Sequence, residues 1–381
     1  MPLLKTPRNK ALLVILRTQD RSDVSFRESY EELKELTESA LIRVLGAIEG
    51  NIHEPNPRYF IREGKLEEAK NRAKQLTANV LIFNVDLSPA QARNIEMLLK
   101  VHVMDRTGLI LEIFGRRAKS KEGKLQVELA QLKYLLPRLG GLGKVMSRLG
   151  GGIGSRGPGE PELEHDRRKI RKRIQRVKEE LEKVEQHRSL IRDGRKKKHF
   201  MTVAIIGYTN AGKSTLLNAL TGAEAYVEDK LFATLDPMTR AASINGSTQV
   251  LFIDTVGFIR DLPHDLVESF HATLEEVRES DILLHVLDAS DPHAEAQKAV
   301  VEMVLKEIDA ANKKTVLVLN KEDLLDENRK KFIGSMWPAA VLVSAKQKVG
   351  LEALLERINE VCGSRKSQGK NNFTWSRHAT I

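Results

Sequence analysis

One glycine-rich octapeptide constrains the fold of this chain more than any other feature. It fits the pattern G-x-x-x-x-G-K-[ST] and reads Gly207-Tyr208-Thr209-Asn210-Ala211-Gly212-Lys213-Ser214. A short β-branched apolar segment, 203–206, precedes it, and residues 215–220 have the composition of a helix start. In the order strand, glycine loop, helix, backbone N–H groups and the helix N-terminus converge on phosphate oxygens. The stretch therefore predicts a nucleotide-phosphate site rather than a plain glycine turn with an incidental Lys-Ser pair.

Two side chains of this loop have predicted contacts with phosphate and metal. Lys213 is expected to reach the β- and γ-phosphates and to act in catalysis. The Ser214 hydroxyl is expected to hold Mg²⁺. The neighbouring Thr215 opens the helix, and we include it among the nucleotide-binding residues.

Composition limits the function classes. The chain has 381 residues, of which 41% are hydrophobic, so two or three domains with sizeable cores are expected. No run of 18 apolar residues and no signal-peptide core are present, and Cys362 is the only cysteine. We therefore expect a cytoplasmic protein with no membrane span, no disulfide framework and no multi-cysteine metal site. We also expect it to be a monomer. The net charge of +10 favours polyanionic partners such as nucleic acid.

The first domain, residues 1–115, alternates strand-like and helix-like segments, which predicts a small parallel α/β domain. The predicted strands are 11–16, 41–48, 79–85 and 101–105. The predicted helices are 27–39, 65–76 and a helix to residue 99 with Ser88 as N-cap and Pro89 at its first position. Two polar stretches, 56–65 and 105–108, are either partner contacts or ordinary connections.

Residues 116–199 predict an antiparallel helical hairpin. Apolar residues at alternating spacings of three and four mark a first helix over 125–139 and a second over 163–191. The connection, 140–162, contains nine glycines and two prolines, so it is either a linker or a functional tip. The second helix is basic, with fifteen Lys or Arg against six Asp or Glu over 165–198. This run is either a solvated face or a surface that binds phosphate backbone.

Residues 200–363 predict a nucleotide domain, followed by a tail, 364–381, that we expect to be disordered. Its apolar segments are 203–206, 250–253, 282–287, 315–319 and 340–343, separated mostly by helical stretches. This order predicts a parallel sheet covered on both faces. Four of the segments end at a polar motif, which places the site at the carboxyl edge of the sheet.

Three further motifs follow these strands. The D-x-x-G motif is Asp254-Thr255-Val256-Gly257, the N-K-x-D motif is Asn320-Lys321-Glu322-Asp323, and the third is Ser344-Ala345-Lys346. Asp254 can hold Mg²⁺ through water, and the Gly257 N–H can sense the γ-phosphate as part of the catalytic set. Asp323 can accept hydrogen bonds from the guanine N1–H and 2-amino group, which adenine lacks. We therefore predict GTP and GDP as ligands.

The base contacts of these motifs can be divided further. Asn320 is expected at the far edge of the base, and the Lys321 stem is expected over its face. Backbone N–H groups of 344–346 are expected to meet guanine O6. Each motif alone is a weak signal, but four in order, each after a strand, are specific for a guanine nucleotide.

The loop between the first helix and the second predicted strand contains Phe232-Ala233-Thr234. We expect all three near the nucleotide, with Thr234 on Mg²⁺ and in catalysis, and Thr239 as the rival ligand. Phe258 stands where many small GTPases carry a water-positioning glutamine, so a partner or ion must complete the site. Asn210 either ligates K⁺ beside the phosphates or stabilises the loop. His264, near the predicted second switch at 263–270, is a candidate base or a surface histidine.

Several of these stretches resemble signatures of the HflX-type GTPases. They are 123–132, 151–160, 207–214, 231–237 and 254–259, and the resemblance extends from about residue 12 to 361. It implies an N-terminal α/β domain with a helical hairpin, followed by a P-loop, Ras-like G domain. The chain departs from many members at Pro161-Glu162, where they have Thr-Gln, and it has only about eighteen residues where several carry a further C-terminal domain.

The resemblance also implies a function. It points to a cytosolic GTPase that binds the large ribosomal subunit and its rRNA through the basic hairpin and helps to split stalled or idle ribosomes under stress. A second hypothesis is a ribosome-assembly factor or RNA chaperone timed by GTP hydrolysis. A third, a membrane-linked regulator of a protease, lacks support because the sequence has no lipidation motif or amphipathic anchor.

Overall fold

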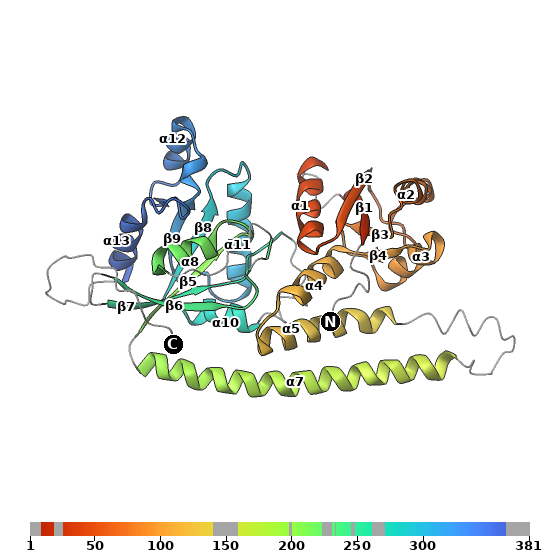
Figure 1. Ribbon diagram of the computed structural model, residues 1–381, viewed down its shortest axis with the longest axis horizontal. Helices are drawn as coiled ribbons and strands as arrows, with labels where there is room; N and C mark the ends of the chain where they lie inside the picture. The colour runs from red at the N-terminus through yellow and green to blue at the C-terminus, as the bar shows by residue number, and fades with distance from the viewer. Residues whose placement is uncertain are drawn as a thin grey trace. The chain divides into compact units, whose positions relative to one another are not determined.

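The computed structural model describes residues 9–18, 26–139, 159–197, 200–222, 231–232, 234–244, 248–260 and 271–362 (Figure 1). The chain divides into two units, Met1–Val184 and Glu185–Ile381. The glycine-rich connection at 140–158, the second switch with His264 and the tail at 364–381 lie outside the described residues. Among the described helices, none is long and apolar enough to cross a membrane.

The first unit contains a parallel sheet of order β2-β1-β3-β4. Its strands are β1 Lys10–Arg17, β2 Arg43–Asn51, β3 Val80–Phe83 and β4 His102–Met104. Its sheet-covering helices are α1 Phe26–Ser39, α2 Glu63–Leu76, α3 Pro89–Leu99 and α4 Arg106–Arg117. Residues 11–16 of β1 are all buried because β1 is central and both faces of the sheet are covered. Figure 1 shows α2 and α3 on one face and α1 and α4 on the other.

Local sequence explains where α3 begins. The Ser88 hydroxyl accepts a hydrogen bond from Gln91 N at 3.2 Å, and Gln91 Oε1 accepts one from Ser88 N at 2.9 Å. Pro89 occupies the first turn, where a missing N–H costs nothing. This reciprocal capping box confirms the predicted start at Ser88-Pro89.

The stretch 105–108 is different from its prediction as a polar connection or partner contact. Asp105 is the N-cap of α4, and its Oδ1 accepts a hydrogen bond from Gly108 N at 2.8 Å. Asp105 and Arg106 are both buried, so the prediction of a loop that contacts a partner is wrong for these residues. The helix escaped prediction because residues 108–114 are buried all round and therefore show no helical periodicity. Similarly, β2 begins at Arg43, because Leu41 has a φ of 59° and lies in a turn.

The helical hairpin consists of α5 Lys121–Arg138 and α7 Gly159–Lys197. Leu125 and Leu129 of α5 pack against Val177 and Leu181 of α7, which are residues of the predicted seam. Beside this apolar cluster, Arg173 donates to both carboxylate oxygens of Glu128 at 2.6 and 2.7 Å. The register of the two helices is therefore set by an apolar stripe and one exposed ion pair.

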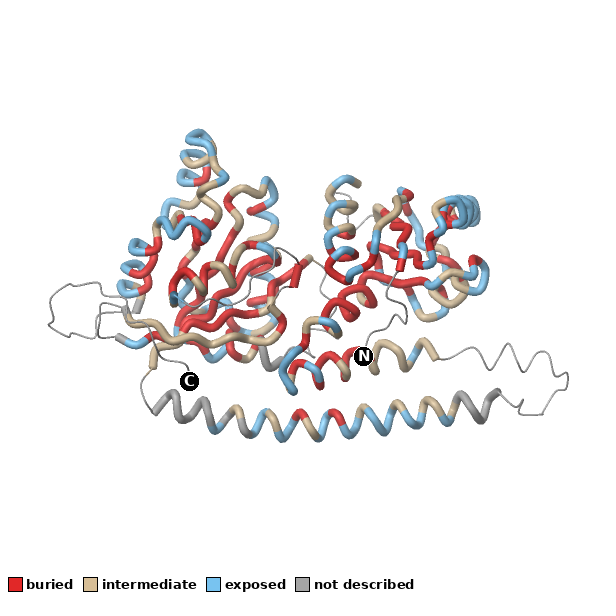
Figure 2. Tube along the Cα trace, in the orientation of Figure 1, coloured by how far each residue is buried: buried red, intermediate tan, exposed pale blue. Residues whose placement is uncertain are grey.

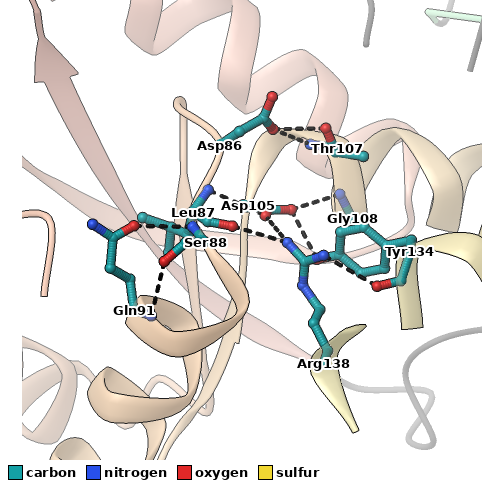
Figure 3. A network of polar contacts seen from close by, with 9 residues as sticks. All are labelled: Asp86, Leu87, Ser88, Gln91, Asp105, Thr107, Gly108, Tyr134 and Arg138. Atoms are coloured by element: carbon teal, nitrogen blue, oxygen red, sulfur yellow. Dashed lines mark hydrogen bonds and ion pairs between the residues drawn. The ribbon is translucent and has the colours of Figure 1, made fainter. Parts of the chain in front are cut away.

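A polar network joins the C-terminal end of α5 to the edge of the sheet (Figure 3). Arg138 Nη2 donates to Asp105 Oδ2 at 2.6 Å and to the Leu87 carbonyl at 3.0 Å. Tyr134 OH donates to Asp105 Oδ1 at 2.8 Å, and the Arg138 guanidinium lies 3.5 Å from the Tyr134 ring centroid. Arg138 is the last residue of α5, so the network fixes the point at which the chain enters the glycine-rich connection.

The second unit contains a six-stranded sheet of order β10-β9-β8-β5-β7-β6. The strands are β5 Met201–Gly207, β6 Met238–Ile244, β7 Thr248–Asp254, β8 Ile282–Asp288, β9 Lys314–Asn320 and β10 Val341–Leu342. The helices are α8 Lys213–Thr221, α10 His271–Glu279, α11 Ala294–Glu307, α12 Glu327–Met336 and α13 Leu351–Cys362, with a 3₁₀ turn η2 at Glu322–Leu324. Apolar residues of α8 and α13 share a core with the central strands, which Figure 2 shows as buried.

The edge strand β6 was not predicted, and it is antiparallel to β7. The other five strands are parallel, as expected. Residues 238–243 are only half-buried, and their sequence does not alternate apolar with polar residues. An edge strand of this kind carries no periodic signal, and pairing with β7 holds it in place.

Candidate functional site

The polar motifs of the second unit meet at the carboxyl edge of its sheet, around a pocket of about 390 Å³. This pocket is lined by residues of the octapeptide, of the stretch 232–234, of the D-x-x-G motif and of the loops after β9 and β10. They are Thr209, Asn210, Gly212, Lys213, Ser214, Thr215, Phe232, Thr234, Thr255, Gly257, Asn320, Lys321, Asp323, Leu324, Ala345 and Lys346. The structure thus brings together residues up to 137 positions apart in the sequence, 209 and 346.

Two glycines of the octapeptide are required by their surroundings. Gly207 has a φ of 151°, and a Cβ there would lie 2.2 Å from the Val286 carbonyl oxygen. Gly212 has a φ of 88°, and a Cβ there would lie 2.2 Å from Asn320 Nδ2. Glycine is the residue that accepts these angles and this close approach. The loop can therefore lie directly against β8 and β9.

Lys213, the first residue of α8, lies within the loop. Its ammonium Nζ donates to the Tyr208 carbonyl oxygen at 2.8 Å, and the side chain is buried. Burial lowers the pKa of Lys213 to about 8, and the nearby Asp254 carboxylate opposes this shift. A cation held in this way beside the helix N-terminus is an anion-binding group.

Three oxygen atoms form a cluster at the start of α8. Ser214 Oγ donates to Asp254 Oδ2 at 2.6 Å and lies 2.7 Å from Thr234 Oγ1. Asp254 Oδ1 is buried and has no hydrogen-bond partner among the described residues. Burial raises the pKa of the Asp254 carboxyl. Hydroxyl and carboxylate oxygens are the ligands that Mg²⁺ prefers, so this donor set, with one buried oxygen unsatisfied, fits the ion.

The rival ligand Thr239 lies elsewhere. It is in β6, where it pairs with Ile253 of β7. Phe232 and Thr234 line the pocket, whereas Ala233 lies outside the described residues. Of the two threonines, the structure therefore brings Thr234 to Ser214 and Asp254.

The D-x-x-G segment continues the pairing of β5 with β7 beyond the strand ends. Phe258 N donates to the Gly207 carbonyl at 3.1 Å, and Thr209 N donates to the Phe258 carbonyl at 2.8 Å. The Phe258 side chain is 3% exposed, so the ring belongs to the protein interior. In addition, Arg260 N donates to Tyr208 OH at 3.0 Å. The sequence does not predict this hydrogen bond, because any residue at position 260 other than proline supplies the same backbone N–H donor.

The base side of the pocket is built around Asn320 and Asp323. Asn320 Nδ2 donates to the Ala211 carbonyl at 2.9 Å, and Asn320 Oδ1 accepts from Ala345 N at 3.0 Å. Its amide therefore ties the octapeptide to the loop after β10. The Ser344 hydroxyl donates to Asp323 Oδ1, which orients that carboxylate.

The remaining predicted residues differ in how they meet the pocket. Lys321 lines it and forms an ion pair with Asp288 at 2.7 Å. Glu322 forms an ion pair with Lys330 at 3.1 Å and, like Val256, does not line the pocket. Asn210 is exposed at the pocket with a φ of 61°. Leu324 also lines the pocket and was missed, although its place directly after N-K-x-D is a usable signal.

Family comparisons cover most of the chain. Residues 27–115 match the family described as GTP-binding GTPase N-terminal, and 117–195 match the GTP-binding GTPase Middle Region. Residues 202–321 match the family described as 50S ribosome-binding GTPase. These three matches follow the order expected for the HflX architecture.

Two curated relatives are similar to this chain over most of its length. GTPase HflX of Caldanaerobacter subterraneus subsp. tengcongensis is 50% identical over 358 residues, which are 94% of this chain and 82% of the relative. GTPase HflX of Escherichia coli K12 is 46% identical over 354 residues, 92% of this chain and 82% of the relative. A GTP-binding protein from Sulfolobus solfataricus, solved in complex with GDP, is 27% identical with a TM-score of 0.46, covering 93% of this chain and 98% of that chain. The chain belongs to the HflX family of GTPases.

Proposed function

We propose that this GTPase binds the large ribosomal subunit through the basic helix α7 and couples GTP binding and hydrolysis to the splitting or rescue of ribosomes under stress. The observation that carries the proposal is the charge of the face of α7 opposite its apolar seam. The match of residues 202–321 to a ribosome-binding GTPase family supports it.

The charged face of α7 follows from helical spacing. The seam residues Val177 and Leu181 are buried in the hairpin. Lys172, Arg176 and Lys183 are exposed, and at about 100° per residue they lie roughly half a turn around the helix from that seam. Exposed Glu179 and Glu182 lie on the same face, but Arg168, Lys172, Arg176 and Lys183 leave it with a net positive charge. A net positive face of this kind suits the regularly spaced phosphates of RNA. The same spacing explains why these charges do not interfere with packing against α5.

The site residues divide the work of GTP hydrolysis. We assign Lys213 to the β- and γ-phosphates, the Gly257 N–H to the γ-phosphate and Asp323 to the guanine edge. Ser214, Thr234 and Asp254 would hold Mg²⁺, which supplies neutralisation of the phosphate charge when it is bound. Water attacks the γ-phosphorus in line, and GDP and phosphate leave.

The site is an incomplete catalyst in isolation. Phe258 is buried and cannot orient water by hydrogen bonding. We assign completion of the site to the large subunit, so that ribosome contact triggers hydrolysis and release. Asn210, exposed at the pocket, is the proposed ligand for K⁺ beside the phosphates. The protein would act as a cytoplasmic monomer.

A sucrose gradient tests the proposed function. Intact ribosomes are incubated with the protein and GTP or a slowly hydrolysed analogue, and subunits are separated from whole ribosomes. A splitting factor shifts ribosomes to subunits, whereas Lys213→Ala, without its phosphate-binding cation, leaves them intact. An assembly factor would instead bind immature particles and leave intact ribosomes unchanged with either nucleotide.

Charge reversal tests the role of α7 separately. The variant Lys172→Glu/Arg176→Glu changes the charge by −4 on the proposed contact face. The matched control Lys306→Glu/Lys331→Glu makes the same change at exposed residues of α11 and α12. We expect the first variant to lose large-subunit affinity and to flatten its salt dependence, by about 0.7–0.9 in log–log slope for each phosphate contact removed. Equal losses in both variants would assign the effect to net charge rather than to α7.

A further inference from the structure

The nucleotide pocket contains a buried hydroxyl group that has no hydrogen-bond partner in the part of the chain that the structure describes. Thr209, third in the octapeptide, is 6% exposed and lines the pocket. Its Oγ1 is buried and has no hydrogen-bond partner among the described residues. A buried polar group without a partner costs about 1–3 kcal/mol and is uncommon in native proteins. A bound ligand that accepts a hydrogen bond from this hydroxyl would remove that cost.

Its neighbours identify the end of the pocket to which Thr209 belongs. A Cβ added at Gly257 would lie 2.8 Å from Thr209 Cγ2 and 3.0 Å from Lys213 Nζ. The methyl group of Thr209 therefore faces the place where the D-x-x-G glycine and the ammonium meet, and both of these groups serve the γ-phosphate. A rotation of about 120° about χ1, to another staggered rotamer, brings Oγ1 to the position that Cγ2 holds. The guanine end is distinct, because there Gly212 approaches Asn320.

The backbone around Thr209 is fixed, so its Cα–Cβ bond has a defined direction. Thr209 N donates to the Phe258 carbonyl at 2.8 Å, and Phe258 N donates to the Gly207 carbonyl at 3.1 Å. Thr209 N is therefore already occupied, and the polar group that this residue can offer to a ligand is its hydroxyl. This role differs from that of a loop residue that binds phosphate through its backbone.

We propose that the Thr209 hydroxyl donates a hydrogen bond to a γ-phosphoryl oxygen of GTP and thereby helps the site to distinguish GTP from GDP. The hydroxyl is unsatisfied without nucleotide and with GDP, and it gains its acceptor by rotation about χ1 when the γ-phosphoryl group is present. It supplies a polar side chain at the same end of the pocket where Phe258, in place of glutamine, supplies none. No bond to Thr209 is made or broken in this role.

Nucleotide binding by the full-length protein tests the assignment. Affinities for GDP and for the analogue GMPPNP are measured with Mg²⁺ for wild type, Thr209→Val and Thr209→Ser. A hydrogen bond to a charged acceptor predicts that Thr209→Val weakens GMPPNP binding on the order of 10- to 100-fold and GDP binding less than about 2-fold. Thr209→Ser, which keeps the hydroxyl, should restore most of the GMPPNP affinity.

Thr255 provides a matched control. It is also buried beside the pocket, but its hydroxyl donates to the Ile205 carbonyl at 2.7 Å. Thr255→Val should therefore affect GDP and GMPPNP affinities alike and lower the melting temperature of the nucleotide-free protein. Thr209→Val should leave that melting temperature unchanged or raise it, because replacing an unsatisfied buried hydroxyl removes a cost.

The two readouts make the proposal refutable. It is overturned if Thr209→Val weakens GDP and GMPPNP equally, or weakens neither. It is also overturned if this variant destabilises the nucleotide-free protein as much as Thr255→Val does, because the hydroxyl would then have a partner within the protein. None of these outcomes depends on ribosomes, so they are independent of the test of the proposed function.

Discussion

Replacing Arg138 with methionine should destabilise the first unit by about 3 kcal/mol, because it leaves the Asp105 carboxylate buried without its cation. Asp105 is 1% exposed and accepts hydrogen bonds from Arg138, Tyr134, Gly108 and Leu87 N. Methionine has similar length but donates none. Removing one partner of a buried pair costs about 3–5 kcal/mol, and the lower end applies because the Arg138 side chain is 20% exposed.

Hydrogen exchange of the full-length protein measures this loss locally. At about 1.4 kcal/mol per factor of ten, 3 kcal/mol corresponds to protection factors roughly 150-fold lower in β4 and α5. Amides of the second unit provide an internal control. Arg173→Met is the matched substitution in the same hairpin, because the Arg173–Glu128 pair is exposed and should contribute less than about 1 kcal/mol. Equal losses of protection in Arg138→Met and Arg173→Met would show that burial of Asp105 does not make its ion pair with Arg138 more stabilising than an exposed pair.

The same variant should have a characteristic pH dependence. Burial raises the pKa of Asp105, and Arg138 opposes that shift, so its removal raises the folded-state pKa further. An acid whose pKa is raised on folding binds more protons in the folded state, so stability falls as pH rises through that window. The loss of stability in Arg138→Met, relative to the wild type, should therefore be largest at neutral pH and should shrink as the pH falls towards 4. A deficit that grows on acidification contradicts this account.

Three further predictions concern the second unit. His285 is buried in β8, and burial lowers its pKa from 6.5 to about 4. The stability that neutral His285 contributes is therefore fully present above pH 6.5 and is lost as the pH falls towards 4. In urea unfolding, His285→Leu should lack about 3 kcal/mol of this loss of stability in acid. Asp323→Asn should weaken GTP binding about 100-fold or more and improve the relative binding of xanthosine triphosphate, whose 2-carbonyl can accept from the amide, as competition binding would show. Replacing K⁺ with Na⁺ should lower the GTPase rate of the wild type but not that of Asn210→Ala, which should already be slow in both salts.

Local sequence rules were sufficient where a residue's role depends on its immediate neighbours along the chain. The capping box at Ser88 and the strand–loop–helix context of 203–220 are examples. The spacing of Leu125, Leu129, Val177 and Leu181 likewise predicts the seam that joins α5 to α7. In each case the local pattern and the tertiary packing favour the same structure.

Features that depend on distant residues could not be predicted. Residues 108–114 of α4 are buried all round, and β6 is held by pairing to its neighbour, so neither carries a periodic signal. The Asp105–Arg138 pair joins residues 33 positions apart. The same applies to Asn320, whose amide links two loops, and to Thr209, whose unsatisfied hydroxyl is visible only once the surrounding atoms are placed.

The buried Phe258 leaves the GTPase site without a water-positioning side chain, and we propose that the large ribosomal subunit completes the site. The most direct test is the steady-state rate of GTP hydrolysis by the full-length protein, measured with increasing amounts of isolated large subunits. We expect the rate to rise to saturation, by about tenfold or more, in wild type but not in Lys213→Ala, since supplying a missing water-positioning or charge-stabilising group has large effects in this enzyme class. An unchanged rate in the presence of saturating large subunits would contradict the account.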